Sequence, residues 1–156
     1  MIHKMNPHVQ KALADISSSE KEHVERGFRF LAEAIQQNVV TGFVADDSAA
    51  QEVYLDAASL REIQEAVLSW IRQHPEHQSA GLAFFVLGKF FDKRLVPKFR
   101  EWLIHYVQAI EANLSPVGQI LIGLDNMGES VFLNGSFSAI EHSKILDDAL
   151  AYLCKQ

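Results

Sequence analysis

The sequence predicts an all-α fold in which six or seven helices pack as stacked antiparallel pairs within one domain, residues 1–156. Apolar side chains recur at helical spacing along most of the chain, capping residues precede several of these runs, and no run alternates as a half-buried strand would. The run from Ala80 to Gly88 carries no charge on any side. Neighbouring helices must therefore cover it, and residues 82–86 should lie at the centre of the molecule.

Helical signals begin near the N-terminus. Asn6 followed by a proline is typical of a helix start and predicts a short helix over residues 7–16. Ser19 and Glu22 match a capping box, which predicts a second helix over residues 20–40. Its apolar face is a single stripe formed by Val24, Phe28, Leu31, Ala32, Ile35 and Val39.

An acidic break separates this helix from the next one. Residues 41–56 hold four carboxylates and no cation, and they are long for a connection between packed helices. We expect at most a short helical turn within them, near residues 49–54. Asp56 or Ser59 then caps a helix over residues 57–73, which a proline terminates.

The central pair consists of a buried helix over residues 78–91 and a two-faced helix over residues 96–113. The turn between them contains Asp92 and Pro97, so we expect the second helix to fold back over the first. The buried face of the second helix should consist of Phe99, Trp102, Leu103, Tyr106, Val107, Ile110 and Leu114.

Two more helices complete the prediction. Ser115 followed by a proline predicts a helix over residues 115–128, and Asn134–Gly135 is a turn signal. Ser138 and Glu141 form a second capping box, which opens a last helix that ends near Leu153. The inner face of that helix should be Ile145, Leu146, Ala149, Leu150 and Leu153.

A faint internal repeat relates residues 79–92 to residues 115–129, with a period of about 37 residues. Both copies open with a small polar residue and lead through a turn into an amphipathic second helix. Stacked helix pairs would cover the apolar side that each pair leaves open. An irregular helical bundle without a true repeat is the alternative.

Composition limits the class of partner. The 156 residues are 48 % hydrophobic, with a net charge of −6 and a pI near 5.6, which disfavours a bulk preference for nucleic acid. A single cysteine, Cys154, cannot form an internal disulfide. The N-terminus lacks a signal-peptide core, and the uncharged run over residues 78–88 is too short to span a bilayer. We therefore expect a cytoplasmic protein that does not associate with membranes.

The segment from Phe85 to Pro97 resembles a HEAT-type repeat. Such repeats often end the first helix with a leucine–glycine step, then place an acidic residue in the turn and a hydrophobic–proline start on the second helix. Asp92, Leu95 and Pro97 fit that pattern. Phe91 departs from it, because a glycine is usual at this position. The resemblance implies a short HEAT-like solenoid.

The final third, residues 124–129 through 134–138, resembles the C-terminal end of small HEAT-like immunity proteins. Those proteins belong to bacterial polymorphic-toxin and contact-dependent inhibition systems. The resemblance implies a cytoplasmic, non-enzymatic protein that binds one cognate toxin domain, often a nuclease, and neutralises it by occlusion.

Candidate catalytic groups are few. The segment from His74 to His77 brings two histidines and Glu76 together, but the intervening proline prevents one helix from presenting both rings on the same face. His105 has no acidic partner suggested by spacing, and Cys154 lies in a terminus that frays. We therefore expect no enzymatic activity, no metal site and no cofactor.

Charge is distributed unevenly along the chain. Residues 89–100 carry a local charge of +4, between two acidic regions, residues 33–76 and 101–148, of −6 each. A normally solvated surface is one interpretation, and a surface complementary to a charged protein is the other. A basic ridge of Lys93, Arg94, Lys98 and Arg100 could instead bind nucleic acid, which is the alternative function. The expected partner-binding residues are Asp46, Asp47, Glu52, Asp56, Glu62 and Glu65, followed by Asp125, Glu129, Asp147 and Asp148.

Overall fold

The computed structural model describes residues 5–133 and 142–155. These residues form eight α-helices and two short 3-10 turns and contain no strand, which confirms the all-α prediction. The elements are α1 (Pro7–Ile16), α2 (Lys21–Val39), α3 (Ser48–Gln51), α4 (Ala57–Gln73), α5 (Ala80–Gly88), η1 (Lys93–Leu95), α6 (Val96–Val107), η2 (Ile110–Ala112), α7 (Leu114–Asn126) and α8 (His142–Leu153).

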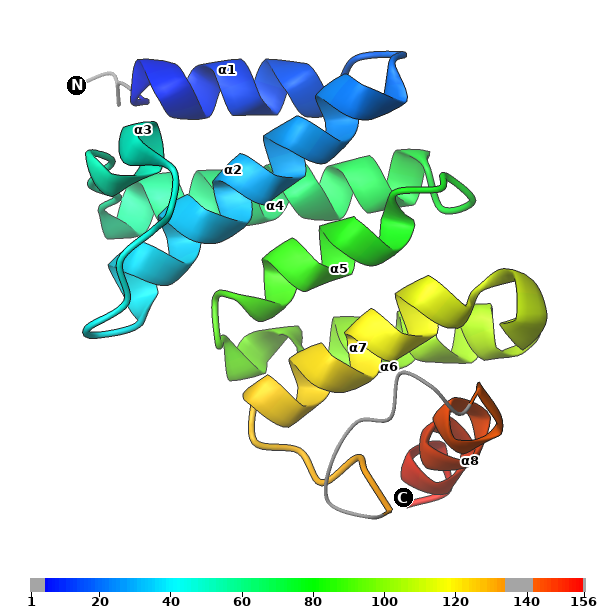
Figure 1. Cartoon of the computed structure of the whole chain (residues 1–156). Helices are drawn as coiled ribbons and strands as arrows, with labels where there is room; N and C mark the ends of the chain where they lie inside the picture. The colour runs from blue at the N-terminus through cyan, green and yellow to red at the C-terminus, as the bar shows by residue number, and fades with distance from the viewer. Residues whose placement is uncertain (1–4, 134–141, 156) are drawn as a thin grey trace.

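The helices are arranged around α5. This helix packs along α7 on one side and α2 on the other, and it also contacts α4. Figure 1 shows α2, α5 and α7 following one another down the molecule, with α4 behind α2 and α6 behind α7. The terminal helices α1 and α8 therefore lie at opposite ends (Figure 1). The finer expectation of a HEAT-like solenoid stays a prediction.

The uncharged helix is at the centre, as its composition predicted. Phe84 of α5 has no exposed surface, and its ring meets Phe99 and Tyr106 of α6 edge-on at centroid distances of 5.5 and 5.9 Å. Leu82 and Phe85 are half-buried and form the edge of this centre. The other fully buried α5 side chains are Ala83, Val86 and Leu87.

Glycines allow α5 and α7 to approach closely. A Cβ at Gly88 would lie 3.3 Å from the Cα of Gly123, and a Cβ at Gly123 would overlap the buried ring of Phe99. No larger side chain fits at Gly123 without displacing that ring. The close contact explains why α5 and α7 share the most extensive helix–helix contact among the described residues.

Several predicted helix starts are confirmed. The Asn6 side chain accepts a hydrogen bond from the backbone N–H of His8 at 2.8 Å, and Asp56 Oδ1 accepts one from Ser59 at 2.8 Å. The expected helical turn in the acidic break is α3, where the Asp47 side chain accepts from the N–H of Ala49. These carboxylates and amides satisfy backbone donors that the first helical turn leaves unpaired.

The capping box predicted at Ser19 is wrong. Helix α2 begins after Glu20, which makes no side-chain capping hydrogen bond. Ser18 takes the local role instead, because its Oγ accepts a hydrogen bond from the N–H of Glu20 at 3.0 Å and lies 3.3 Å from His23 Nδ1. Serine side chains compete in this way for nearby backbone donors.

The long helix predicted over residues 96–113 is shorter in the structure. Helix α6 ends at Val107, and the 3-10 turn η2 follows it. The Asn113 side-chain amide donates to the carbonyls of Tyr106 and Ala109, at 3.4 and 3.0 Å. These donors replace the helical N–H groups that would have continued the hydrogen-bond ladder.

Two further corrections concern the C-terminal third. Helix α7 begins at Leu114, so Ser115 lies inside its first turn and does not cap it. In α8 the buried side chains include Asp148 and Tyr152, whereas Leu150 is 45 % exposed, so the inner face is rotated from the predicted one. The turn at residues 134–135 and the capping box at Ser138 lie outside the described residues.

Within the described ranges, none of the helices combines the length and the apolar character needed to cross a membrane.

Candidate functional site

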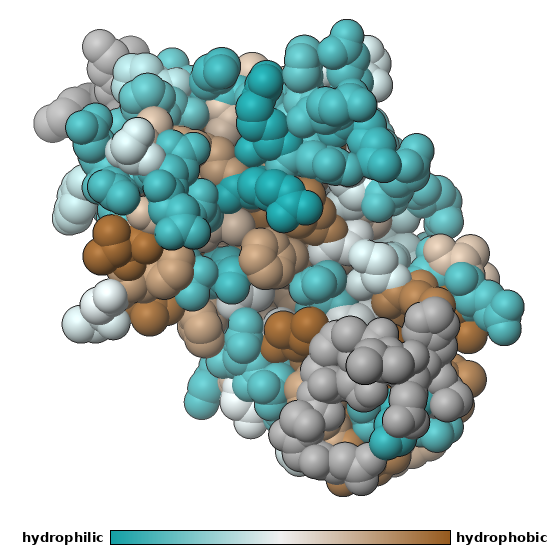
Figure 2. Space-filling view, in the orientation of Figure 1, coloured by the Kyte–Doolittle hydropathy of each residue, from teal (hydrophilic) through white to brown (hydrophobic). Residues whose placement is uncertain are grey.

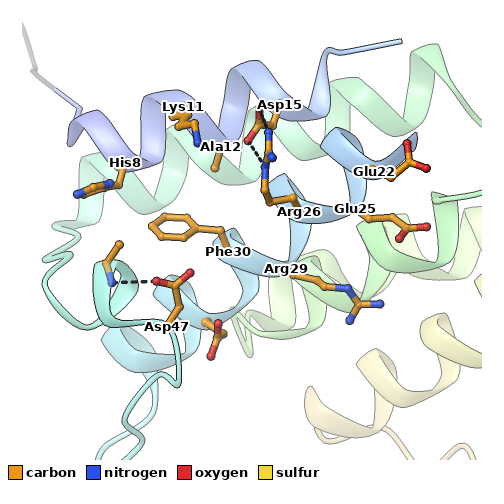
Figure 3. A pocket seen from close by; sticks show the side chains of 12 residues that line it. His8, Lys11, Ala12, Asp15, Glu22, Glu25, Arg26, Arg29, Phe30 and Asp47 are labelled. Carbon is orange, nitrogen blue, oxygen red and sulfur yellow. Dashed lines mark hydrogen bonds and ion pairs between the residues drawn. The ribbon is translucent and has the colours of Figure 1, made fainter. Parts of the chain in front are cut away.

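A groove of about 490 Å³ lies between α1, α2 and α3, and we call it the α1–α2 groove. Figure 3 shows its side chains projecting from the facing sides of α1 and α2, with Asp47 at the α3 end. The surface over α1 and α2 is mostly hydrophilic, as the upper part of Figure 2 shows. The groove is lined by His8, Lys11, Ala12, Asp15, Glu22, Glu25, Arg26, Arg29, Phe30, Glu33, Asp47 and Ala49.

Phe30 is the apolar centre of the groove. Its side chain is half-buried on α2, and its ring centroid lies 6.3 Å from that of His8 on α1 (Figure 3). The small side chains of Ala12 and Ala49 leave space beside the ring. A partly exposed aromatic ring surrounded by charged side chains provides both apolar contact area and a polar rim.

The rim carries both kinds of charge. Arg26 and Asp15 neutralise one another through two hydrogen bonds of 3.2 and 3.3 Å. Lys11 and Arg29 make no ion pair or hydrogen bond within the part of the chain that the structure describes. Glu25 pairs with Lys21 at 3.7 Å, so outside these two ion pairs the groove presents three carboxylates, Glu22, Glu33 and Asp47, against two cations.

A second hollow, of about 320 Å³, adjoins the groove along α2. Glu25 and Arg29 line both spaces, and the second one extends to Leu82 and Phe85 of α5 and to Gln119 of α7. The two hollows together follow the surface from α1 across α2 to α7. This elongated outline suits an extended or helical segment of a polypeptide.

The first group of predicted acidic residues is divided between two places. Asp46 and Asp47 lie beside α2, where Glu33 Oε1 accepts a hydrogen bond from the N–H of Asp46 at 2.8 Å. Glu62 and Glu65 are exposed on α4, which lies behind α2 in Figure 1. Glu52 follows α3, and Asp56 caps α4. Only Asp47 among the predicted residues lines the α1–α2 groove.

The second predicted group does not form a free acidic surface. Asp148 is only 6 % exposed, and its Oδ1 accepts a hydrogen bond from the N–H of Leu133 at 2.9 Å. Glu129 accepts a hydrogen bond of 2.7 Å from the hydroxyl of Tyr152. Asp125 remains exposed near the end of α7, and Asp147 remains exposed in the middle of α8. The expectation that Asp148 belongs to a contact surface is therefore corrected, since its carboxylate is buried and bonded to Leu133.

Four of the basic residues over 89–100 have local partners. Arg94 pairs with Asp92 at 2.9 Å, and Lys98 approaches Glu101 at 3.9 Å. Arg100 lies over the Tyr152 ring, 4.7 Å from its centroid. Lys89 lies in the same way over the ring of Phe85, and burial lowers the pKa of Lys89. These four cations therefore have different local neighbours, and binding of nucleic acid by the basic residues stays a prediction.

The two histidines of the segment from His74 to His77 pack against the ring of Trp70. The rings of His74 and His77 lie 5.0 and 5.1 Å from the Trp70 ring, and His77 Nδ1 accepts a hydrogen bond from the N–H of Ser79. Burial, and secondarily the charge of His74, lowers the pKa of His77. His105 also has an acidic neighbour that spacing did not suggest, Glu76, at 3.3 Å. No group of three or more metal-ligating side chains occurs among residues 5–133 and 142–155.

The sequence interpretation missed the groove residues on α1 and α2. One signal for them was available, because Phe30 lies outside the apolar stripe predicted for residues 20–40. A large aromatic residue on an otherwise polar helix face supplies apolar contact area that can pack or bind. Its role has to be argued from geometry, because comparison with protein-family models, with curated proteins and with solved structures finds no match for this chain.

Proposed function

We propose that this protein is a non-enzymatic binding protein whose α1–α2 groove receives a segment of a partner protein. The observation that carries the proposal is the half-buried Phe30 ring at the centre of a charged groove. Protein interfaces share this layout of an apolar centre and a polar rim. The excess of carboxylates over unpaired cations favours a partner segment that carries basic side chains.

In its specific form, the proposal is that the partner is a bacterial toxin domain, which is neutralised by occlusion in the cytoplasm. The resemblance of residues 85–97 to a HEAT-type repeat and of residues 124–138 to small immunity proteins supports this form. Asp47 supports it as well, since it adds negative charge at the α3 end of the groove, and the exposed Asp46 precedes it directly in the chain. An acidic surface accelerates encounter with a basic protein.

The test uses a secreted toxin domain encoded next to this protein in its genome. We expect the two proteins to co-purify and to bind in titration calorimetry. Removing the charges with Asp46→Asn and Asp47→Asn should weaken binding at least about tenfold, and Phe30→Ala should do the same. Asparagine at position 47 keeps an N-cap acceptor for α3, so folding is preserved.

The matched control removes two charges of the same predicted group from α4, with Glu62→Gln and Glu65→Gln. We expect these changes to leave the affinity unchanged, because neither residue lines the groove. Failure of the toxin domain to bind would contradict the toxin-neutralising function. Binding that survives both groove changes, or that only the α4 changes weaken, would contradict the groove as the site.

A further inference from the structure

A second surface, separate from the α1–α2 groove, lies where the turn after α5 meets the first half of α4. Phe91 follows α5 with a φ of +50°, and it is the one non-glycine residue with positive φ among the residues described. The left-handed conformation is unfavourable for a residue with a Cβ, and more so for a bulky one. Strained residues of this kind concentrate at functional sites.

The strained residue is also exposed. The Phe91 side chain is 41 % exposed, although the neighbouring Phe90 is buried. A glycine would adopt this backbone conformation without strain, and helices commonly end with one. A phenylalanine at position 91 therefore lowers the stability of the folded protein relative to a glycine, and the fold itself does not require it.

Phe91 borders a hollow of about 350 Å³ formed by the end of α2, the first half of α4 and the α5–η1 turn. Its apolar lining includes Val39 and Leu60, both half-buried. Its polar lining includes two guanidinium groups, those of Arg61 and Arg94. Aromatic and arginine side chains are the residue types enriched at the centres of protein interfaces.

The two guanidinium groups are held differently. Arg94 is fixed by two side-chain hydrogen bonds to Asp92, each 2.9 Å long, and the carboxylate is further occupied by Gln64 at 3.1 Å. Arg61 is exposed and makes no ion pair or hydrogen bond in the described part of the chain. One cation is thus oriented in advance, and the other is free to pair with an incoming anion.

We propose that this hollow binds a segment of a partner protein in which a carboxylate lies beside a large apolar side chain. The apolar side chain packs between Phe91 and Leu60, and the carboxylate pairs with Arg61. A polyanion such as nucleic acid fits less well, because Asp92 already neutralises Arg94 in the hollow and leaves Arg61 as the one lining cation without an ion pair or hydrogen bond among the described residues. This surface is separate from the α1–α2 groove and does not rest on the function proposed above.

The probe is a phage-displayed library of random twelve-residue peptides, selected on the intact protein. Enriched peptides should place aspartate or glutamate next to leucine, phenylalanine or another large apolar residue. Their affinity, measured by fluorescence anisotropy, should fall at least tenfold with Phe91→Gly and with Arg61→Ala, and Phe91→Tyr should retain it. Tyr54→Ala is the control, since Tyr54 is 81 % exposed and does not line the hollow.

A stability measurement separates the backbone strain at Phe91 from the contact that its ring makes with the peptide. Phe91→Gly should unfold at a higher temperature than Phe91→Ala, because only glycine relieves the backbone, while both variants lose the peptide. The proposal is overturned if selected peptides bind Phe91→Gly as tightly as the wild type, or if selection enriches no acidic–apolar sequence. Tight binding of a single-stranded oligonucleotide that Arg61→Ala abolishes would also overturn it, in favour of nucleic acid.

Discussion

At the scale of the residue, Asp92 shows how one carboxylate organises a turn. It accepts hydrogen bonds from the backbone and the guanidinium of Arg94 and from the side-chain amide of Gln64. The side-chain hydrogen bond from Arg94 is the main reason that the pKa of Asp92 falls from 3.8 to about 2. The carboxylate thereby ties the α5–η1 turn to α4, because Gln64 belongs to α4.

This pKa predicts a pH-dependent contribution to stability. The folded-state pKa lies below the unfolded one, so the stabilisation is complete above about pH 4 and is lost as the pH falls toward 2. Asp92→Asn should lower the free energy of unfolding by about 1 kcal/mol at pH 7, a modest value because Arg94 is 84 % exposed. Urea unfolding of both proteins at pH 7 and at about pH 2.5 measures the difference, and an equal difference at the two pH values would contradict the assignment.

At the scale of the element, most helices could be predicted because their signals are local. Apolar spacing and caps at Asn6 and Asp56 gave the bounds of α1 and α4 as the structure has them. The errors arose where a distant side chain intervened. The amide of Asn113 ends α6 early, and the contacts of Asp148 and Tyr152 rotate the buried face of α8. Spacing along one helix does not reveal which neighbour it will meet.

A buried hydrogen bond connects α4 to the end of α1. Trp70 Nε1 donates to the carbonyl of Ile16 at 2.8 Å in a buried setting. Trp70→Phe leaves this carbonyl without its donor and should cost about 1–3 kcal/mol. Hydrogen exchange should accelerate more in α1 than in α7. Trp102→Phe is the control, since the structure gives the indole N–H of this half-buried residue no hydrogen-bond partner among the described residues. The prediction would be contradicted if exchange in Trp70→Phe accelerated as much in α7 as in α1, or if Trp102→Phe accelerated exchange in α1 equally.

At the scale of the whole molecule, α5 joins the two ends. It contacts α2 and α4 on one side and α7 on the other, and Phe84 fills the space toward α6. If the N-terminal and C-terminal halves unfolded independently, each would need its own hydrophobic core. Instead, helices from both halves pack against α5. The structure therefore favours a single cooperative unfolding transition.

Adjacent phenylalanines test this arrangement. Phe84→Ala should lower the free energy of unfolding by about 3–5 kcal/mol, because a buried cavity forms among aromatic rings. Phe85→Ala should cost clearly less, since Phe85 is half-buried at the edge of the core. Circular dichroism and tryptophan fluorescence should report coincident transitions in urea. Separate transitions in the wild type, or equal losses in the two variants, would contradict the central role of α5.

The sequence by itself determined the all-α class, the place of α5 at the centre and most helix bounds, because hydrophobic spacing and capping act over a few residues. Only the tertiary structure decided which charges share a surface. It separated Asp47 from Glu62, buried Asp148, gave Arg94 and Arg100 different partners and assembled the α1–α2 groove around Phe30. The physical reason is that the position of a surface charge depends on how helices cross, and their crossing is set by contacts such as Gly88 against Gly123 between residues far apart in the chain.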